Sequence, residues 1–157
     1  MRPQILIVDD DPIIREVYAA LLGALEADVV QASDGYEALA VVRRNSFSLV
    51  LLDINMPGLS GRQVAAALRR DPHSNPLPIV FVTGEAPEDG ASAEETLGKA
   101  DMLLVKPVEP ETLKSLARLL LRLYAERRQA IEEVQYARTE LRELRARVAT
   151  LAPVDRG

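Results

Sequence analysis

The chain has 157 residues, of which 48% are hydrophobic and 27% charged, and its formal net charge at pH 7 is −5. This length allows one buried core with an appendage, and the composition excludes a wholly disordered chain. The absence of cysteine excludes disulfides and thiolate metal sites. No apolar run approaches membrane-spanning length and the apolar run near the N-terminus is too short for a signal peptide, so we expect a cytoplasmic protein without membrane contact.

Five short and nearly continuous apolar runs alternate with helical patterns along the chain. Such runs are typical of strands that are covered on both faces, as in a parallel sheet. Five β-α units predict an α/β fold with an open, doubly wound sheet, whose sites form beyond the carboxyl ends of the strands. The predicted strands are Ile5–Val8, Val29–Ala32, Leu49–Leu52, Ile79–Val82 and Met102–Val105.

Helices are predicted between these strands. The first has apolar residues at helical spacing from Ile13 to Leu25, and it follows Asp11 as N-cap and Pro12 in the first turn. The second and third are predicted over Gly35–Arg44 behind Asp34 and over Gly61–Arg70 behind Ser60.

The segment from Glu85 to Lys99 is a weak helical pattern. It contains Pro87, Gly90 and Gly98, which interrupt helices. We therefore expect a short fourth helix, within Ala91–Leu97.

Polar residues follow four of the predicted strands. Asp9 and Asp10 follow the first strand, Asp53 the third, Thr83 the fourth and Lys106 the fifth, so parallel strands bring all five to one edge of the sheet. Three neighbouring carboxylates raise one another's pKa, and a hard cation such as Mg²⁺, which binds carboxylates, water and phosphate oxygens, relieves the repulsion. The lysine and the threonine hydroxyl can contact phosphoryl oxygens. The sequence thus predicts a phosphorylatable, magnesium-dependent acidic pocket.

Four motifs together resemble the receiver domain of two-component response regulators. They lie in the family's order and spacing over roughly four-fifths of the chain. The resemblance implies a flavodoxin-like sheet with strand order 2-1-3-4-5 and a receiver domain over residues 1–124. The matching stretches are ILIVDDD at Ile5–Asp11, DINMPGLSG at Asp53–Gly61, VTG at Val82–Gly84 and LVKP at Leu104–Pro107.

The resemblance also implies the metal ligands. Asp53 would be the phosphoacceptor and would bind Mg²⁺ together with Asp10, while Asp9 would act through water. Asn55 would offer its backbone carbonyl to the metal.

The remaining pocket residues are implied to act on the phosphoryl group. Thr83 and Lys106 would contact it, and the Lys106–Pro107 bond would be cis. The donor would be a sensor histidine kinase or a phosphotransfer protein. Asn55 and Glu85 would tune the lifetime of the acyl phosphate, so the expected chemistry is phosphoryl acceptance and slow autodephosphorylation, without enzymatic turnover on a substrate.

Several residues also have a purely structural alternative. Asp11 is expected to be only a helix cap, and Thr83 could merely satisfy a backbone group at its strand end. Gly58 and Gly61 are expected to allow turn geometry, and the lone His73 is expected in an exposed loop.

Two other functions stay open. Receivers usually carry Tyr or Phe three residues before the motif lysine, where this chain has Leu103, and a common Phe is replaced by Val108. A pseudo-receiver scaffold that dimerises without phosphorylation is therefore an alternative. A phosphatase of the haloacid-dehalogenase type also uses a strand-end aspartate, but it needs a second Asp where Asn55 stands.

The C-terminal segment predicts a parallel coiled coil. From Glu111 no Pro or Gly occurs before Pro153, so we assign a coiled coil over 125–152, a tail over 153–157 and a homodimer through 113–151. Glu133 and Glu140 at g positions face Arg138 and Arg145 at the following e positions, as in a parallel pair. The a positions are Leu113, Leu120, Arg127, Val134, Leu141 and Val148, and the d positions are Leu116, Leu123, Ala130, Ala137, Leu144 and Leu151.

This segment has an alternative structure and an unknown output. It could instead be a fifth helix that packs on the domain and then frays. Its nine basic and five acidic residues predict a solvated face without nucleic-acid binding. Arg127 at a core-type position suggests a hinge where phosphorylation alters helix pairing, and an output domain outside this chain is expected.

Overall fold

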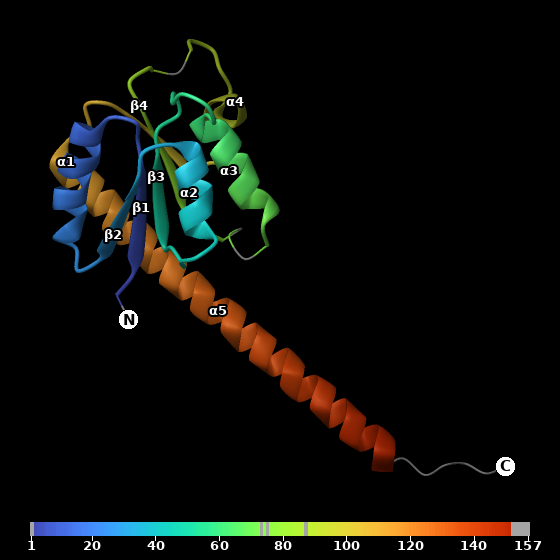
Figure 1. Ribbon diagram of the computed structural model, residues 1–157. Coiled ribbons are helices and arrows are strands. Elements are labelled where there is room, and N and C mark those ends of the chain that lie inside the picture. The colour runs from blue at the N-terminus through green and yellow to red at the C-terminus, as the bar shows by residue number, and fades with distance from the viewer. Residues whose placement is uncertain (1, 73, 75, 87, 152–157) are drawn as a thin grey trace. The chain divides into compact units, whose positions relative to one another are not determined.

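The structure is a computed structural model that describes residues 2–72, 74, 76–86 and 88–151. The chain divides into two compact units, Met1–Tyr124 and Ala125–Gly157 (Figure 1). The expectations for His73 and for the 153–157 tail lie outside the described residues.

The first unit contains a five-stranded parallel sheet with the order β2-β1-β3-β4-β5. This order confirms the flavodoxin-like topology. Parallel pairing sets all carboxyl ends at one edge, as in the register Ile7↔Leu51 and Val8↔Leu52 between β1 and β3. The strands are β1 (Gln4–Val8), β2 (Asp28–Ala32), β3 (Leu49–Leu52), β4 (Ile79–Thr83) and β5 (Met102–Val105).

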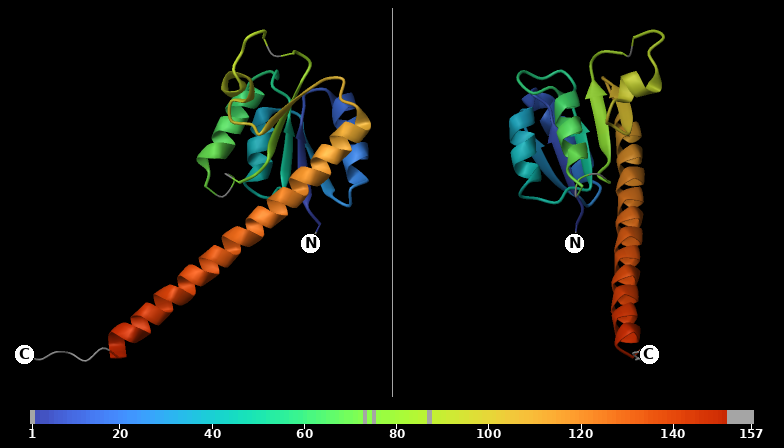
Figure 2. Two further views of the ribbon diagram at one scale, coloured as in Figure 1. Left: turned by 180° about the vertical axis from the view of Figure 1, so that it is seen from behind. Right: turned by 90° about the vertical axis from the view of Figure 1, so that its right-hand side faces the viewer.

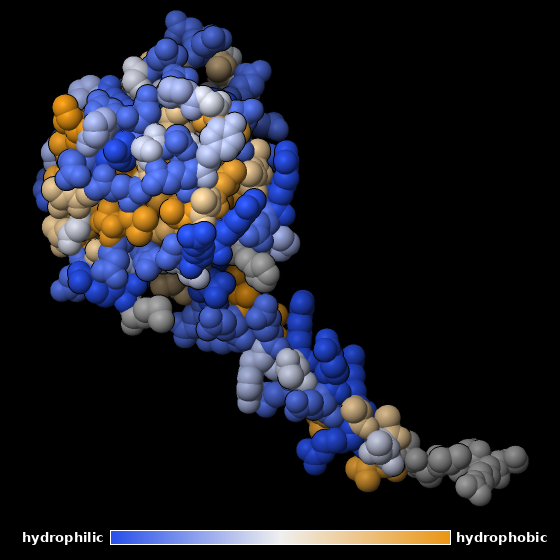
Figure 3. Space-filling model, viewed as in Figure 1, coloured by the Kyte–Doolittle hydropathy of each residue, from blue (hydrophilic) through white to orange (hydrophobic). Residues whose placement is uncertain are grey.

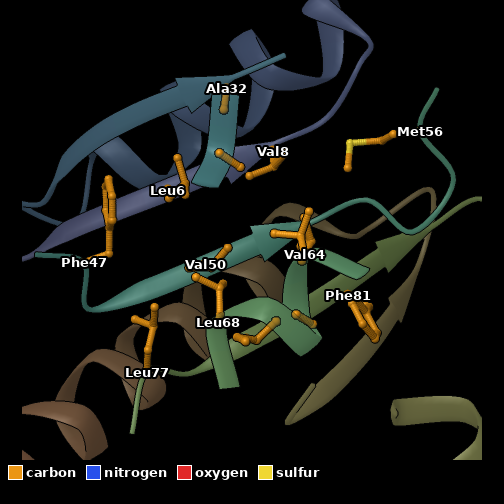
Figure 4. Close-up of a cluster of buried hydrophobic side chains, with 14 residues drawn as sticks. Leu6, Val8, Ala32, Phe47, Val50, Met56, Val64, Leu68, Leu77 and Phe81 are labelled. Carbon is orange, nitrogen blue, oxygen red and sulfur yellow. The ribbon is translucent and has the colours of Figure 1, made fainter. Parts of the chain in front are cut away.

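Alternate residues of the central strands feed two hydrophobic cores, one on each face of the sheet. Leu6, Val50 and Phe81 point to the face covered by α2 and α3, as Figure 4 shows for part of this core. Their neighbours Ile7 and Leu51 point to the face covered by α1 and the beginning of α5 (Figure 2). This period of two explains why the strand sequences are apolar throughout.

The outer strands depart from the expectation of complete coverage. β1 and β4 are buried over almost their whole length, whereas most residues of β2 are only partly buried. In β5, Met102 and Val105 are 38% and 40% exposed. An edge strand has a neighbour on only one side, so an apolar sequence there does not guarantee burial.

Helices α1 (Pro12–Gly23), α2 (Gly35–Val42) and α3 (Gly61–Arg70) begin where the sequence predicted. Asp11, Asp34 and Ser60 each accept a hydrogen bond from the first turn of their helix, which confirms the three caps. The second helix ends at Val42 instead of Arg44. On α1, Ile13 is 71% exposed although it belongs to the apolar pattern.

Helix α4 (Ala93–Leu97) is as short as expected. Ser92 and Glu95 form a capping box at its start, and Gly98 follows its end. None of its residues is buried. Little hydrophobic packing therefore holds this helix on the domain.

Helix α5 (Pro110–Leu151) begins inside the first unit. Leu113 and Ala117 are 1% exposed, and Leu116 and Leu120 pack against the same core. The dimer seam predicted over 113–151 therefore begins too early. Leu113, Leu116 and Leu120 pack in their own domain, and a side chain buried there cannot also pair with a second chain.

The second unit is described as the continuation of α5 to Leu151. Four of its seam residues, Val134, Leu141, Leu144 and Val148, are between 47% and 58% exposed. Figure 3 shows a mostly hydrophilic surface on this helix, with hydrophobic side chains near its C-terminal end. Among the described residues, no helix combines the length and the apolar character needed to cross a membrane.

Candidate functional site

The carboxyl ends of β1 and β3 bring three carboxylates together. Asp9, Asp10 and Asp53 each offer an oxygen, and these oxygens lie within 4.8 Å of one another. The Asp53 N–H donates to the Val8 carbonyl at 2.9 Å, so sheet pairing itself places the two strand ends side by side. Asp9 and Asp53 are buried and Asp10 is exposed.

Lys106 lies directly beside two of these carboxylates. Its Nζ donates to Asp9 Oδ2 at 2.7 Å and is 3.8 Å from Asp53 Oδ2. Its backbone N–H donates to the Thr83 carbonyl at 2.7 Å, and the Lys106–Pro107 bond is cis, as expected. In this structure the ammonium therefore makes its closest ion pair with Asp9 and a looser one with Asp53.

The pocket changes the ionisation of its members. Burial raises the pKa of Asp53 to about 6; the positive charge of Lys106 opposes this rise, while the negative charge of Asp9 adds to it. Burial lowers the pKa of Lys106, but the hydrogen bond to Asp9 and the charge of Asp53 outweigh it, so that pKa is raised overall. At pH 7 the Asp53 carboxyl is then mostly ionised and able to act as a nucleophile.

Thr83 ends β4 and is 2% exposed. Its Oγ1 accepts a hydrogen bond from the Glu85 N–H at 3.2 Å, which is the structural role that the sequence left open. The hydroxyl proton can still be donated, so this bond does not exclude contact with a phosphoryl oxygen. Thr83, Asn55 and Glu85 line an open cavity of about 510 Å³ at this edge of the sheet.

Gly61 shapes the loop that follows Asp53. A Cβ at this position would lie 2.1 Å from the Asp53 carbonyl oxygen, closer than any side chain tolerates. The Gly61 N–H donates to the Ile54 carbonyl at 2.8 Å and closes the loop. Glycine is thus required for close approach here, whereas Gly58 is required because its φ is +79°.

The donor set of the pocket fits a hard cation. Three carboxylates offer only oxygen ligands, the type that Mg²⁺ prefers, and they carry enough negative charge to need neutralisation. Burial makes ionisation of Asp53 unfavourable and the neighbouring carboxylate of Asp9 adds to this, and the positive charge of a bound divalent cation would offset both.

Sequence reasoning missed two residues of α1 next to this pocket. Arg15 Nη1 donates to the Asp9 carbonyl at 2.7 Å. Tyr18 is buried in the same region of the domain as Asp9 and Asp53, and burial raises the pKa of its phenol. Their spacing of three residues puts both on one helix face, but the sequence showed Tyr18 only as part of an apolar stripe.

Residues 5–118 match the family described as the response regulator receiver domain. The chain belongs to this family. This match confirms the resemblance that the sequence motifs indicated. The acidic pocket at the ends of β1 and β3 lies within the matched residues.

Known relatives of this receiver domain include proteins that it matches over nearly their whole length and longer proteins. It is 36% identical over 110 residues to the protein PilH of Pseudomonas aeruginosa, covering 70% of this chain and 90% of PilH. It is 35% identical over 121 residues to the probable transcriptional regulator ycf27 of Porphyridium aerugineum, covering 77% of this chain and 49% of that protein. The chain thus spans about half the length of that regulator.

One solved structure bears on the metal. The response regulator protein TrrA of Thermotoga maritima, in complex with Mg(2+)-BeF, is 31% identical with a TM-score of 0.66. The similarity covers 75% of this chain and 98% of TrrA.

Proposed function

We propose that this receiver domain accepts a phosphoryl group on Asp53 from the phosphohistidine of a sensor histidine kinase or phosphotransfer protein. The observation that carries the proposal is the crowding of three strand-end carboxylates, with Lys106 Nζ 3.8 Å from Asp53 Oδ2. An isolated strand-end aspartate would need neither metal-ligating neighbours nor a lysine.

The metal would be Mg²⁺. Asp10, Asp53 and the backbone carbonyl of Asn55 would hold it, with Asp9 acting through water. When bound, it supplies positive charge to the phosphoryl oxygens during transfer.

The transfer uses the chain's own groups in defined roles. An oxygen of the Asp53 carboxylate attacks phosphorus, so that a P–O bond forms as the P–N bond to the donor histidine breaks, and the released imidazole nitrogen keeps the electron pair. Lys106 turns from Asp9 toward the arriving phosphoryl oxygens, and the Thr83 hydroxyl donates to another of them. Water later hydrolyses the acyl phosphate, at a rate tuned by Asn55 and Glu85, and no other substrate is turned over.

Intact mass measurement tests this proposal. With acetyl phosphate and Mg²⁺, the wild type should gain the mass of one phosphoryl group, and EDTA should prevent it. Asp53→Ala should gain none. Asp28→Ala, which removes an exposed carboxylate at the amino end of β2 and thus at the opposite edge of the sheet, is the matched control and should be modified like the wild type. An unmodified wild type, or equal modification of Asp53→Ala, would contradict the assignment.

The second part of the proposal concerns the output. We infer that residues 1–124 act as the receiver and 125–152 as a parallel coiled-coil homodimer, with its seam from Arg127 to Leu151. The half-exposed apolar residues at heptad spacing support this. The protein would act in the cytoplasm, without binding nucleic acid itself, and would pass its signal to an output domain outside this chain.

Cysteine crosslinking tests whether the coil responds to phosphorylation. Single cysteines between Val134 and Val148 should give different crosslink patterns with and without the phosphoryl group if the stretch around Arg127 is a hinge. Identical crosslink patterns in the two states would contradict the hinge hypothesis.

A phosphorylation-independent scaffold is the second candidate. It is favoured by Leu103, because an aliphatic side chain stands where receivers usually have an aromatic one. This candidate predicts an unmodified wild type that is nevertheless dimeric by sedimentation.

A further inference from the structure

Helix α4 is attached to the domain by arginines of α3. Arg62 Nη2 donates to the Thr96 carbonyl at 2.9 Å, and Arg69 Nε donates to the Lys99 carbonyl at 3.0 Å. The two arginines are seven residues apart, two helical turns, and therefore lie on one face of α3. Because α4 has no buried residue, these charged donors at its C-terminal end contribute much of its attachment.

Arg69 is bound at several points, whereas Arg62 is held more loosely. Arg69 also donates to the Leu77 carbonyl at 2.6 Å and pairs with Asp101 at 2.9 Å. The Arg62 guanidinium lies over the buried Phe81 ring, 5.4 Å from its centre. Across the described residues, Arg62 has no carboxylate within ion-pair distance. Of the two, Arg62 is the one free to change partner.

Arg62 shares a cavity with residues of the phosphorylation pocket. Arg62 and Thr96 line the open cavity of about 510 Å³ together with Asn55, Thr83 and Leu103. The tether of α4 and the hydroxyl expected to contact the phosphoryl group thus face the same open space. Leu103 has no polar atom in its side chain, so it can neither donate to a phosphoryl oxygen nor bind the Thr96 carbonyl.

Phosphorylation of Asp53 would change the charge next to this cavity, because Asp53 directly precedes Ile54 and Asn55, which line it. An ionised carboxylate carries one negative charge, whereas an acyl phosphate carries close to two, with three acceptor oxygens. A guanidinium prefers such an anion to a neutral carbonyl, because it can donate two parallel hydrogen bonds to phosphoryl oxygens and gains the attraction between opposite charges.

We propose that Arg62 is a further residue of the phosphorylation site, whose guanidinium leaves the Thr96 carbonyl for the phosphoryl group on Asp53 and thereby releases α4. This inference rests on the proposed phosphorylation of Asp53. It gives the domain a readout that does not need an aromatic residue at position 103.

Hydrogen exchange of the peptide over 91–99 tests the release. In unmodified protein the Thr96 and Gly98 amides donate to Ser92 and Glu94 carbonyls, which should protect them. Phosphorylation should raise their exchange about tenfold, since a hydrogen bond to a charged group contributes roughly that factor to local opening. Intact mass measured on the same sample shows that one phosphoryl group is bound, and the absence of added mass on Asp53→Ala assigns it to Asp53.

Two variants with long, unbranched side chains test whether the charge of Arg62, and not only its packing, is needed for the response. Arg62→Met should exchange about tenfold faster already without phosphorylation and should show no further rise. Arg62→Lys keeps the cation and should keep a phosphorylation-dependent rise. Arg70→Met, which removes an exposed arginine from the same helix, is the matched control and should behave like the wild type.

The outcomes distinguish the two proposals. If no phosphoryl group is found on the wild type, the proposed function fails and the inference with it. If Asp53 is phosphorylated but exchange over 91–99 is unchanged, the inference alone is overturned. It is also overturned if Arg62→Lys and Arg62→Met respond to phosphorylation in the same way.

Discussion

The two units use apolar residues in opposite ways. In the first unit, side chains such as Leu6 and Phe81 are completely buried between the sheet and its helices. In the second, Leu141 and Leu144 stay about half exposed on a single helix. The first unit therefore completes its own core, whereas the apolar stripe of the second stays half exposed along the helix, and we propose that a partner helix covers it. The same residue type stabilises the fold of the first unit and, in the proposed dimer, would stabilise the association of the second.

The largest expected effect is loss of the domain core. Phe81→Ala should lower the free energy of unfolding of the first unit by about 3–5 kcal/mol, because it removes a fully buried ring and leaves a cavity. Leu144→Ala, on the second unit, should change domain unfolding by less than about 0.5 kcal/mol. Urea denaturation followed by circular dichroism measures both. If both variants lowered the free energy of unfolding equally, the conclusion that only the first unit has its own core would be wrong.

The next effect is on association. Leu141→Asp places a charge in the predicted seam and should weaken dimerisation at least about a hundredfold, equivalent to roughly 3 kcal/mol. The domain should remain folded. Thr139→Asp, at an outward f position of the same heptad, is the matched control and should leave the dimer intact. Sedimentation equilibrium measures the dissociation constant, and a monomeric wild type would contradict the coiled coil.

A smaller effect concerns the buried carboxylates of the first unit. The pKa of Asp53 rises from its ordinary 3.8 to about 6 on folding, so the folded chain holds a proton that the unfolded chain has lost between these values. Ionisation of Asp53 therefore destabilises the fold increasingly as pH rises from about 4 to 6. Asp53→Asn should remove this penalty and raise the free energy of unfolding by about 1–3 kcal/mol at pH 7.

The pH dependence provides the check. In EDTA, the gain from Asp53→Asn should fall to well under about 1 kcal/mol at pH 4, where the carboxyl is protonated in the folded chain and only about half ionised in the unfolded chain. Asp89→Asn removes an exposed carboxylate and should change stability little at either pH. A gain that is the same at pH 4 and pH 7 would show that the Asp53 charge is not its cause.

The smallest effect tests the orientation of the coil. Glu140→Lys should destabilise a parallel dimer by about 0.5 kcal/mol per pair, because the introduced lysine repels Arg145 of the second chain. Adding Arg145→Glu should restore the stability, as judged by thermal melting at low salt. An antiparallel pair does not bring these positions together, so failure of the double variant to recover would exclude the parallel arrangement.

The fold and the pocket were largely predictable from the sequence, because the helix caps and the strand pattern are both local features and both indicate the same α/β fold. Asp11, Asp34 and Ser60 mark helix starts through short-range hydrogen bonds, which any sequence window contains. The placement of Asp9 and Asp53 at one edge follows from parallel strands alone. The burial of edge strands was less predictable, since exposure depends on what lies beside a strand.

Other features depended on distant parts of the chain meeting. The contact of Lys106 with Asp9 joins residues 97 positions apart, and only the folded sheet shows that the lysine binds Asp9 more closely than Asp53. The contact of Arg62 with Thr96 is of the same kind, because an arginine on a helix surface gives no local sign of its acceptor.

By itself, the sequence determined the family, the strand order and the acids at the strand ends, because these follow from hydrophobic periodicity and from motifs in a fixed order. Only the tertiary structure decided that the first heptads of α5 belong to the domain core, since periodicity marks an apolar face without naming what covers it. It also decided the ionisation of Asp53, because a pKa depends on burial and on charges that neighbouring strands bring close.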